Sequence, residues 1–186
     1  MTAVVSLFRG INVGGNHQVR MDALKALHEA LGLRGVSPYI QSGNVVFHAD
    51  AADLAELRGH IEEGFATQFG FYSAVFLRTS AEIQAIIDRN PFAGQEGKAS
   101  KWLVVLFLAS PPDASAQDAL LKTYAGPEEI FIIGQEAYIY YPEGMGRSKL
   151  TGSLLEKKLK TPGTARNWNT VLELQKRLRA LDVSDK

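Results

Sequence analysis

The sequence contains no cysteine, and this absence excludes several kinds of chemistry at once. Disulfide bonds, thiolate catalysis, and zinc or iron–sulfur sites with cysteine ligands cannot occur. The P-loop, the dinucleotide-binding fingerprint and the nucleophile elbow of serine hydrolases are missing too. The four histidines lack the spacing of a metal-binding motif: His17, His28, His48 and His60. We therefore expect neither a cofactor nor a metal, and the sequence identifies no catalytic residue.

Net charge and long apolar runs are also lacking. Among 186 residues, 20 are basic and 20 are acidic, so no overall field favours nucleic acid or a membrane as partner. No apolar run approaches the roughly 18 residues of a membrane-spanning helix. The N-terminal stretch MTAVVSLFRG has no charged region of the kind that begins a signal peptide. These features predict a cytoplasmic protein without a membrane partner, and they leave its oligomeric state open.

The basic residues are unevenly distributed along the chain. Residues 144–179 contain nine basic residues against two acidic ones, Glu156 and Glu173. The basic ones are Arg147, Lys149, Lys157, Lys158, Lys160, Arg166, Lys176, Arg177 and Arg179. This local excess of positive charge favours a nucleotide, a nucleic acid or another anionic ligand as partner.

Hydrophobic periodicity and turn residues predict the elements. In the first half we expect strands over 3–9, 36–41, 44–49 and 72–78, and helices over 21–32, 52–69 and 80–90. In the second half we expect strands over 101–109, 128–133 and 136–141, and helices over 113–126, 147–159 and 167–181. The small, polar stretch 91–101 is typical of a connector. The predicted organisation is a first subdomain over 1–90, that connector, and a second subdomain over 102–186 with an extra C-terminal helix.

The order of these elements predicts an α+β fold. The first half has the order β-α-β-β-α-β, and the second half has the order β-α-β-β-α-α. Both match a ferredoxin-like βαββα unit, with a helix in place of the last strand of the second copy. The stretches AVVSLF and WLVVLFL are apolar at nearly every position, so we expect both strands to be covered on both faces. The simplest cover for each unit is the other, which predicts duplicated ferredoxin-like units packed into one body.

The stretch LFRGINVGGN, residues 7–16, follows the first predicted strand. In a ferredoxin-like unit the first and second strands run in the same direction, so this loop emerges beside the turn QSGN, residues 41–44. The topology then gathers the amide, hydroxyl and guanidinium groups of Arg9, Asn12, Gly14, Gly15, Gln41, Ser42 and Asn44. These groups and free backbone N–H donors suit an oxyanion or a ribose. Alternatively, the glycines only turn the chain and the asparagines tie the loop to itself.

Two further stretches are candidate ligand-binding segments. In PEGMGRSKLT, residues 142–151, the side chains of Arg147, Ser148 and Lys149 open a predicted helix and could hold an anion. The alternative is a solvated basic turn with Ser148 as the helix cap. In TARNWNT, residues 164–170, Arg166 and Asn167 precede Trp168, whose indole could stack on a ring. Helical spacing equally makes Trp168 the first core residue of the last helix.

Four stretches occur in an order that resembles a known family: LFRGINVGGN, YIQSGNVVF, YYPEGMGRSKLT followed by EKKL, and TARNWNTV. The sequence resembles, over nearly its whole length, the uncharacterised bacterial proteins of domain of unknown function 1697. The resemblance implies two ferredoxin-like halves and carries over no catalytic residue. His17 and Gln18 stand where the family pattern implies a more basic loop.

Several functions follow from these patterns. The first hypothesis is a binding protein for an anionic ligand, a nucleotide or nucleic acid. A variant of it is an RNA-binding sheet that stacks bases on Phe8 and Phe47. A second hypothesis is an enzyme acting on a phosphorylated or amide substrate, with His17 or His48 as proton carrier. A third is a scaffold or interaction module without a ligand.

Overall fold

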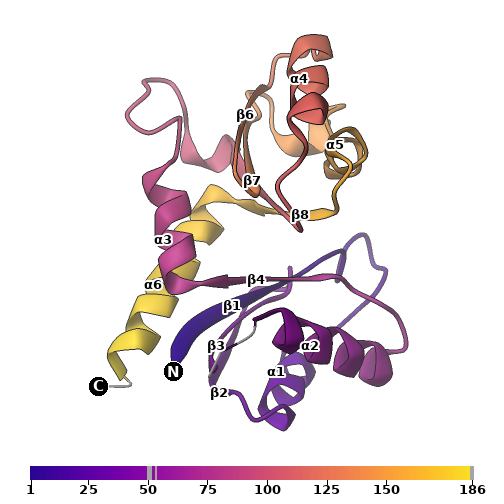
Figure 1. The fold of residues 1–186 in the computed structure, drawn as a ribbon, viewed down its shortest axis with the longest axis vertical. Coiled ribbons are helices and arrows are strands. Elements are labelled where there is room, and N and C mark those ends of the chain that lie inside the picture. The colour runs from indigo at the N-terminus through magenta and orange to yellow at the C-terminus, as the bar shows by residue number, and fades with distance from the viewer. Residues whose placement is uncertain (50–51, 53, 185–186) are drawn as a thin grey trace. The chain divides into compact units, whose positions relative to one another are not determined.

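In the computed structural model of this chain, residues 1–49, 52 and 54–184 are described. They form two compact units, the first made of residues 1–85 and 173–186 and the second of residues 86–172. Figure 1 labels the elements of both units. The predicted connector, residues 91–101, falls within the second unit, and the final helix contributes its residues from Glu173 onward to the first unit. No helix within the described ranges is long and apolar enough to cross a bilayer.

The first unit is a four-stranded antiparallel sheet with helices. Its elements are β1 Thr2–Phe8, α1 Met21–Ala30, β2 Arg34–Tyr39, β3 Asn44–Ala49, α2 Leu54–Phe69, β4 Val75–Thr79 and the first part of α3 Ser80–Asp88. The strand order is β2-β3-β1-β4, with β1 antiparallel to both neighbours. The helix predicted over 52–69 begins at Leu54. Its predicted second position, 53, lies outside the described residues.

The second unit repeats this arrangement. Its elements are a 3-10 turn Ser100–Trp102, β5 Leu103–Leu108, α4 Ala114–Thr123, β6 Glu129–Ile133, β7 Glu136–Tyr140, a 3-10 turn Met145–Arg147, α5 Gly152–Leu159, β8 Gly163–Asn167 and the start of α6 Trp168–Ser184. The strand order is β6-β7-β5-β8, which is the order of the first sheet. The predicted α+β fold with duplicated units is therefore confirmed, while the packing of the two units into one body stays a prediction.

The prediction that a helix replaces the last strand of the second copy is wrong. Residues Gly163–Asn167 form β8 and pair antiparallel with β5, with Arg166 opposite Val105. The stretch GTARN carries no apolar alternation, so only its backbone pairing with β5 makes it a strand. Gly163 is required at this edge because a Cβ there would lie 2.8 Å from the Phe107 carbonyl oxygen.

The helix predicted over 147–159 begins later than expected, at Gly152. Thr151 is its N-cap, and its hydroxyl oxygen accepts a hydrogen bond from the Leu154 backbone N–H at 3.2 Å. Arg147 ends a short 3-10 turn instead, and Ser148 is the C-cap of that turn rather than the N-cap of α5. Arg147 and Lys149 therefore precede α5 and do not lie in its first turn. Cations in that turn would be unfavourable, because the N-terminus of a helix carries a partial positive charge.

Each sheet buries one face against the helices of its own unit. In the first unit, Phe8 and Phe47 are fully buried in a cluster with residues of α1 and α2. The ring of Phe8 lies 5.1 Å from that of Phe65. The hypothesis that Phe8 and Phe47 form an RNA-binding platform is therefore wrong, because both rings are core residues. In the second unit the corresponding cluster is mainly aliphatic and includes Leu106 and Leu155.

A buried polar pair lies within the first core. The Ser6 hydroxyl is 2.9 Å from His28 Nε2, and His28 Nδ1 is 2.8 Å from the Leu24 carbonyl oxygen. Since the carbonyl can only accept, Nδ1 carries the proton and Nε2 accepts from Ser6. Burial lowers the pKa of His28 to about 4, although the Leu24 carbonyl opposes that shift. His28 is therefore a core residue.

Candidate functional site

Residues 9–20, which we call the glycine loop, connect β1 to α1. At its tip Val13 and Asn16 form an isolated antiparallel bridge, and the Asn16 N–H donates to the Val13 carbonyl at 3.0 Å. Gly14 and Gly15 occupy the centre of this turn with φ of +58° and +77°. Such values at both central positions are those of a type I′ turn, a conformation that is unfavourable for most residues other than glycine and asparagine. The glycines are thus explained by the turn they make.

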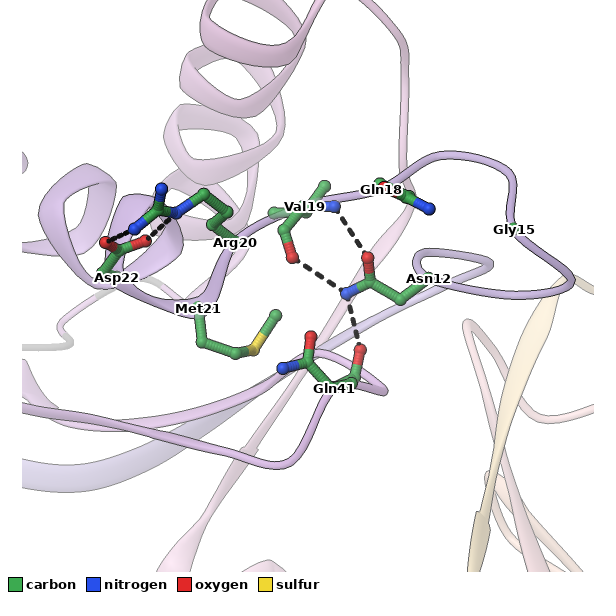
Figure 2. A pocket seen from close by; sticks show the side chains of 8 residues that line it. All are labelled: Asn12, Gly15, Gln18, Val19, Arg20, Met21, Asp22 and Gln41. Atoms are coloured by element: carbon green, nitrogen blue, oxygen red, sulfur yellow. Dashed lines mark hydrogen bonds and ion pairs between the residues drawn. The ribbon is translucent and has the colours of Figure 1, made fainter.

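Asn12 joins the glycine loop to the turn after β2 (Figure 2). Its Oδ1 accepts from the Val19 N–H at 2.7 Å, and its Nδ2 donates to the carbonyls of Val19 at 3.0 Å and Gln41 at 2.8 Å. The predicted meeting of these two segments at one edge of the sheet is therefore observed. Because these bonds occupy both amide hydrogens and the oxygen, they favour a folding role for Asn12.

The turn that follows β2 is likewise held by its own polar groups. Asn44 is fully buried and donates from Nδ2 to the Tyr39 carbonyl and to the Ser42 hydroxyl, both at 3.0 Å. Gly43 has φ of +83°, and a Cβ there would lie 2.5 Å from Ile11 Cδ1. The turn therefore packs closely beneath the glycine loop, and its asparagine acts as a brace.

A cavity of about 680 Å³, the loop hollow, opens beside these segments (Figure 2). It is lined by Asn12, Gly15, Gln18, Val19, Arg20, Met21, Asp22 and Gln41. Arg20 on its rim donates to Asp22 from Nε at 3.0 Å and from Nη2 at 2.7 Å. Arg20 lowers the pKa of the Asp22 carboxyl, and Asp22 raises that of Arg20. The charges on the rim thus compensate one another, and Arg9 is not among the lining residues.

The histidines considered as proton carriers lie in different settings. The exposed ring of His17 stacks on Phe71 with centroids 4.3 Å apart. His48 is buried in β3, where it pairs with Ala3 of β1. In the described part of the chain no three His, Asp or Glu side chains come together as metal ligands.

A second cavity, of about 760 Å³, lies in the second unit and is here called the tryptophan hollow. It is lined by Trp102, Pro142, Glu143, Gly144, Met145, Gly146 and Arg147. The Tyr141 N–H donates to the Trp102 carbonyl at 2.9 Å, which fixes the segment after β7 beside the start of β5. Gly144 has φ of +84°, and a Cβ there would lie 2.8 Å from Trp102 Cζ3. The backbone at Gly144 therefore lies directly against the indole.

One cationic side chain, that of Lys101, lies at this indole, and a second, that of Arg147, lines the hollow. Lys101 Nζ lies 4.8 Å from the centre of the Trp102 ring, and the Lys101 carbonyl accepts from Asn167 Nδ2 at 2.8 Å. Arg147 and Lys149 are exposed, and neither side chain has a hydrogen-bond or ion-pair partner among the described residues. The tryptophan hollow thus combines a half-buried aromatic ring with an arginine whose side chain has no partner among the described residues.

The segment that carries Arg147 is anchored through Glu128. The Ser148 hydroxyl donates to one carboxylate oxygen of Glu128, and the Tyr124 hydroxyl donates to the other. Burial raises the pKa of Glu128, but these hydrogen bonds lower it more, so the net shift is downward. Burial and the carboxylate together raise the pKa of Tyr124 to about 12. Ser148 therefore acts as a tether, which leaves Arg147 and Lys149 as the outward-facing groups of its stretch.

Two of the candidate residues around TARNWNT lie in the protein interior. Arg166 is 6% exposed and donates from Nη1 to the Thr164 hydroxyl at 2.8 Å and to the Ala165 carbonyl at 2.9 Å. Burial lowers its pKa to about 10. Trp168 is 7% exposed and begins the buried stripe of α6, as its helical spacing indicates. Asn167 supports the tryptophan hollow indirectly, because its hydrogen bond to the Lys101 carbonyl holds the backbone of Lys101 in place.

Sequence reasoning missed Trp102 and Lys101 as residues of the site. Both precede β5, and the apolar run WLVVLFL assigns the tryptophan to a strand. The available signal was a lysine directly before a tryptophan at the beginning of a buried strand. A residue at this position is only partly covered by the core, so the indole is half exposed. Only the return of the chain at residues 141–147 brings Arg147 to the same place.

A comparison with family models identifies the group to which this protein belongs. Residues 1–138 match the model described as Protein of unknown function (DUF1697). The chain belongs to the DUF1697 family. The match spans the whole of the first sheet and β5 and β6 of the second, so the predicted membership of this family is confirmed. The stretches LFRGINVGGN and YIQSGNVVF lie within the matched residues, whereas the two later stretches lie beyond them.

The fold of this DUF1697 protein is also found among solved structures. One of them is the conserved bacterial protein SP0830 from Streptococcus pneumoniae, with a TM-score of 0.72 at 23% sequence identity. The alignment covers 95% of this chain and 98% of that chain. A search of curated proteins finds no match. The function of this DUF1697 protein is therefore not established by its relatives.

Proposed function

We propose that this protein binds an anionic ligand that carries a planar ring, a nucleotide or a single strand of nucleic acid, in the tryptophan hollow. The observation that supports this most is the indole of Trp102 bordered by Lys101 and by the guanidinium of Arg147, which has no partner in the described part of the chain. We also propose a cytoplasmic location, where such ligands are abundant.

The chemistry of the hollow suits both parts of such a ligand. A base can stack on an indole, and such stacking contributes about 1–3 kcal/mol per base. Arginine binds phosphate through two parallel hydrogen bonds, which are stronger than neutral ones because donor and acceptor are charged. Lys101 already lies at the ring, so it can accompany the base or turn to the phosphate. Glu143, the one acidic lining residue, disfavours ligands that place a phosphate beside it.

The loop hollow of the first unit supports the proposal less. Its arginine is paired with Asp22 and its Asn12 amide is committed to Val19 and Gln41. An anion would have to displace Asp22 from Arg20 before gaining that cation. The order of preference between the two hollows therefore follows from which cations are already paired.

Binding is tested by titrating the protein with nucleotides and with a short single-stranded oligonucleotide at low salt, and following tryptophan fluorescence. We expect quenching, and an affinity that falls as salt rises because phosphate contacts release counterions. The substitution R147A should weaken binding at least tenfold, and W102F should weaken it and remove most of the quenching. The matched control is R20A, which removes an exposed arginine from the first unit and should leave the affinity unchanged.

Two results would contradict the proposal. One is the absence of any binding at low salt to nucleotides, oligonucleotide and heparin, measured by calorimetry as well as fluorescence. The other is binding that R147A and W102F leave at the parent level while R20A abolishes it, which would assign the ligand to the loop hollow.

A further inference from the structure

The outer edge of the second sheet is unpaired. β6 bonds to β7 on one side, and no other backbone hydrogen bond reaches residues 129–133 from the described part of the chain. Figure 1 shows β6 at the margin of its sheet. An edge strand of this kind presents a row of N–H and C=O groups that can pair with another strand.

The equivalent edge of the first sheet is protected. β2 contains Pro38, which lacks an N–H, and its pairing with β3 shifts register between Arg34 and Ser37. The guanidinium of Arg177 lies 4.4 Å from the centre of the Tyr39 ring. A proline, an irregular register and a covering cation are devices by which natural sheets prevent pairing at an edge.

β6 has neither a proline nor a shift of register. Its five residues, EIFII, pair with β7 in an unbroken register from Glu129 opposite Tyr140 to Ile133 opposite Glu136. Phe131 at its centre is 43% exposed, and its ring lies 5.3 Å from that of Phe92. The one charge of the strand, on Glu129, is paired with Lys98. The edge is therefore regular, apolar and neutral.

We propose that β6 pairs antiparallel with β6 of a second copy of this chain, about a two-fold axis at Phe131. In that register Phe131 faces its own copy and Glu129 faces Ile133, so no like charges meet across the axis. A strand that is complementary to itself forms a closed two-fold dimer, in which both edges are used. Aromatic side chains directly opposite one another stabilise antiparallel pairs. This interface is separate from the tryptophan hollow and does not depend on the proposed function.

The expected dimer is weak and depends on concentration, because a single pair of five-residue strands buries less area than stable dimers do. Sedimentation equilibrium of the intact chain should show the 20.3 kDa monomer when dilute and twice that mass at high concentration. F131K should abolish the dimer. L121K, which places the same charge at the 48% exposed Leu121 of α4, should retain it.

The absence of cysteine permits a second, independent test. In an antiparallel pair, directly opposite Cβ atoms lie about 4.5–5.5 Å apart, close to the roughly 3.5–4.5 Å of a disulfide. The variant F131C should therefore form a disulfide-linked dimer under mild oxidation, while L121C should remain monomeric at the same concentration. Circular dichroism melting of F131C and F131K verifies that both variants fold.

The proposal is overturned by a chain that stays monomeric up to millimolar concentration and whose F131C variant does not cross-link faster than L121C. A dimer that survives F131K also overturns it, because another surface would then hold the copies together. If the pure chain is monomeric but an added peptide of sequence EIFII binds it and F131K prevents that binding, the edge takes a strand of another protein, and the proposed self-pairing fails.

Discussion

The two units share a strand order and the pairing of the first strand with the last, but the residues at equivalent positions differ. In the first unit, Val5 of β1 lies opposite Arg78, and in the second, Val105 of β5 lies opposite Arg166. By this correspondence Ser6, which bonds to the buried His28, is replaced by Leu106 in an aliphatic cluster. The connection after β1 is closed by Asn12, whereas the segment after β7 leaves Arg147 without a partner among the described residues.

This comparison shows how a duplicated fold can divide its tasks. The topology determines where connections emerge, and it does so equally in both units. The hydrogen bonds within each connection decide whether its polar groups are consumed by folding or remain available to a ligand. On this criterion the first unit has an internally bonded loop, and the second has the hollow whose arginine lacks a partner among the described residues.

The largest expected difference between the units is their response to acid. The pKa of His28 is about 4 when folded, against an ordinary value of 6.5, so the unfolded chain binds the proton more readily. The contribution of neutral His28 to the free energy of unfolding is therefore complete above pH 6.5. About 3 kcal/mol of it is lost as the pH falls toward 4. We expect amides of β1 and β3 to lose exchange protection at pH 4.5 relative to pH 7, and amides of β5 and β7 to lose much less.

Matched histidine variants separate His28 from the carboxyl groups that also titrate in acid. The free energy of unfolding, measured by urea denaturation, should differ less between pH 7 and pH 4.5 for H28Q than for the parent protein. H17Q, which alters an exposed ring, should show the same difference as the parent. An NMR titration of His28 with its midpoint near 6.5 would refute the assigned cause.

The next largest effect concerns the brace of the glycine loop. N12A removes three hydrogen bonds and leaves the buried Val19 N–H without its acceptor. We expect the free energy of unfolding to fall by about 2 kcal/mol, since an unsatisfied buried donor costs roughly 1–3 kcal/mol. Urea denaturation measures it, with N16A at the exposed loop tip as the control. Equal stability of the two variants would show that the loop is not held by Asn12.

The smallest of the three effects tests the close approach at the tryptophan hollow. G144A places a Cβ 2.8 Å from the Trp102 ring at a φ of +84°. We expect a loss of about 1–2 kcal/mol from backbone strain and displacement of the ring, with a shift in tryptophan emission. The control is G134A, which has φ of +62° and open space around its Cβ, so it should show the strain without the spectral shift. Identical emission spectra for both variants would show that the backbone at Gly144 does not lie against the Trp102 ring.

The sequence predicted the hairpins, the helices and strands of residues 1–90 to within three residues at each end, and the meeting of Asn12 with the turn at Gln41. It could do so because alternation, glycine and asparagine act locally, and because the strand order follows from a simple rule. It failed at β8, whose polar residues become a strand only by pairing with β5. It also failed to find Trp102, because an apolar run does not reveal which of its ends is uncovered.

The sequence alone determined the absence of thiol chemistry, the α+β class, the duplication of the unit and the side chains available to bind an anion. Tertiary structure alone decided which of those side chains are consumed by folding. Asn12 and Arg166 are bonded internally, while the Arg147 side chain meets no partner within residues 1–49, 52 and 54–184. The physical reason is that a polar group's availability depends on partners far away in the chain. Periodicity and spacing describe only the neighbours within a few residues.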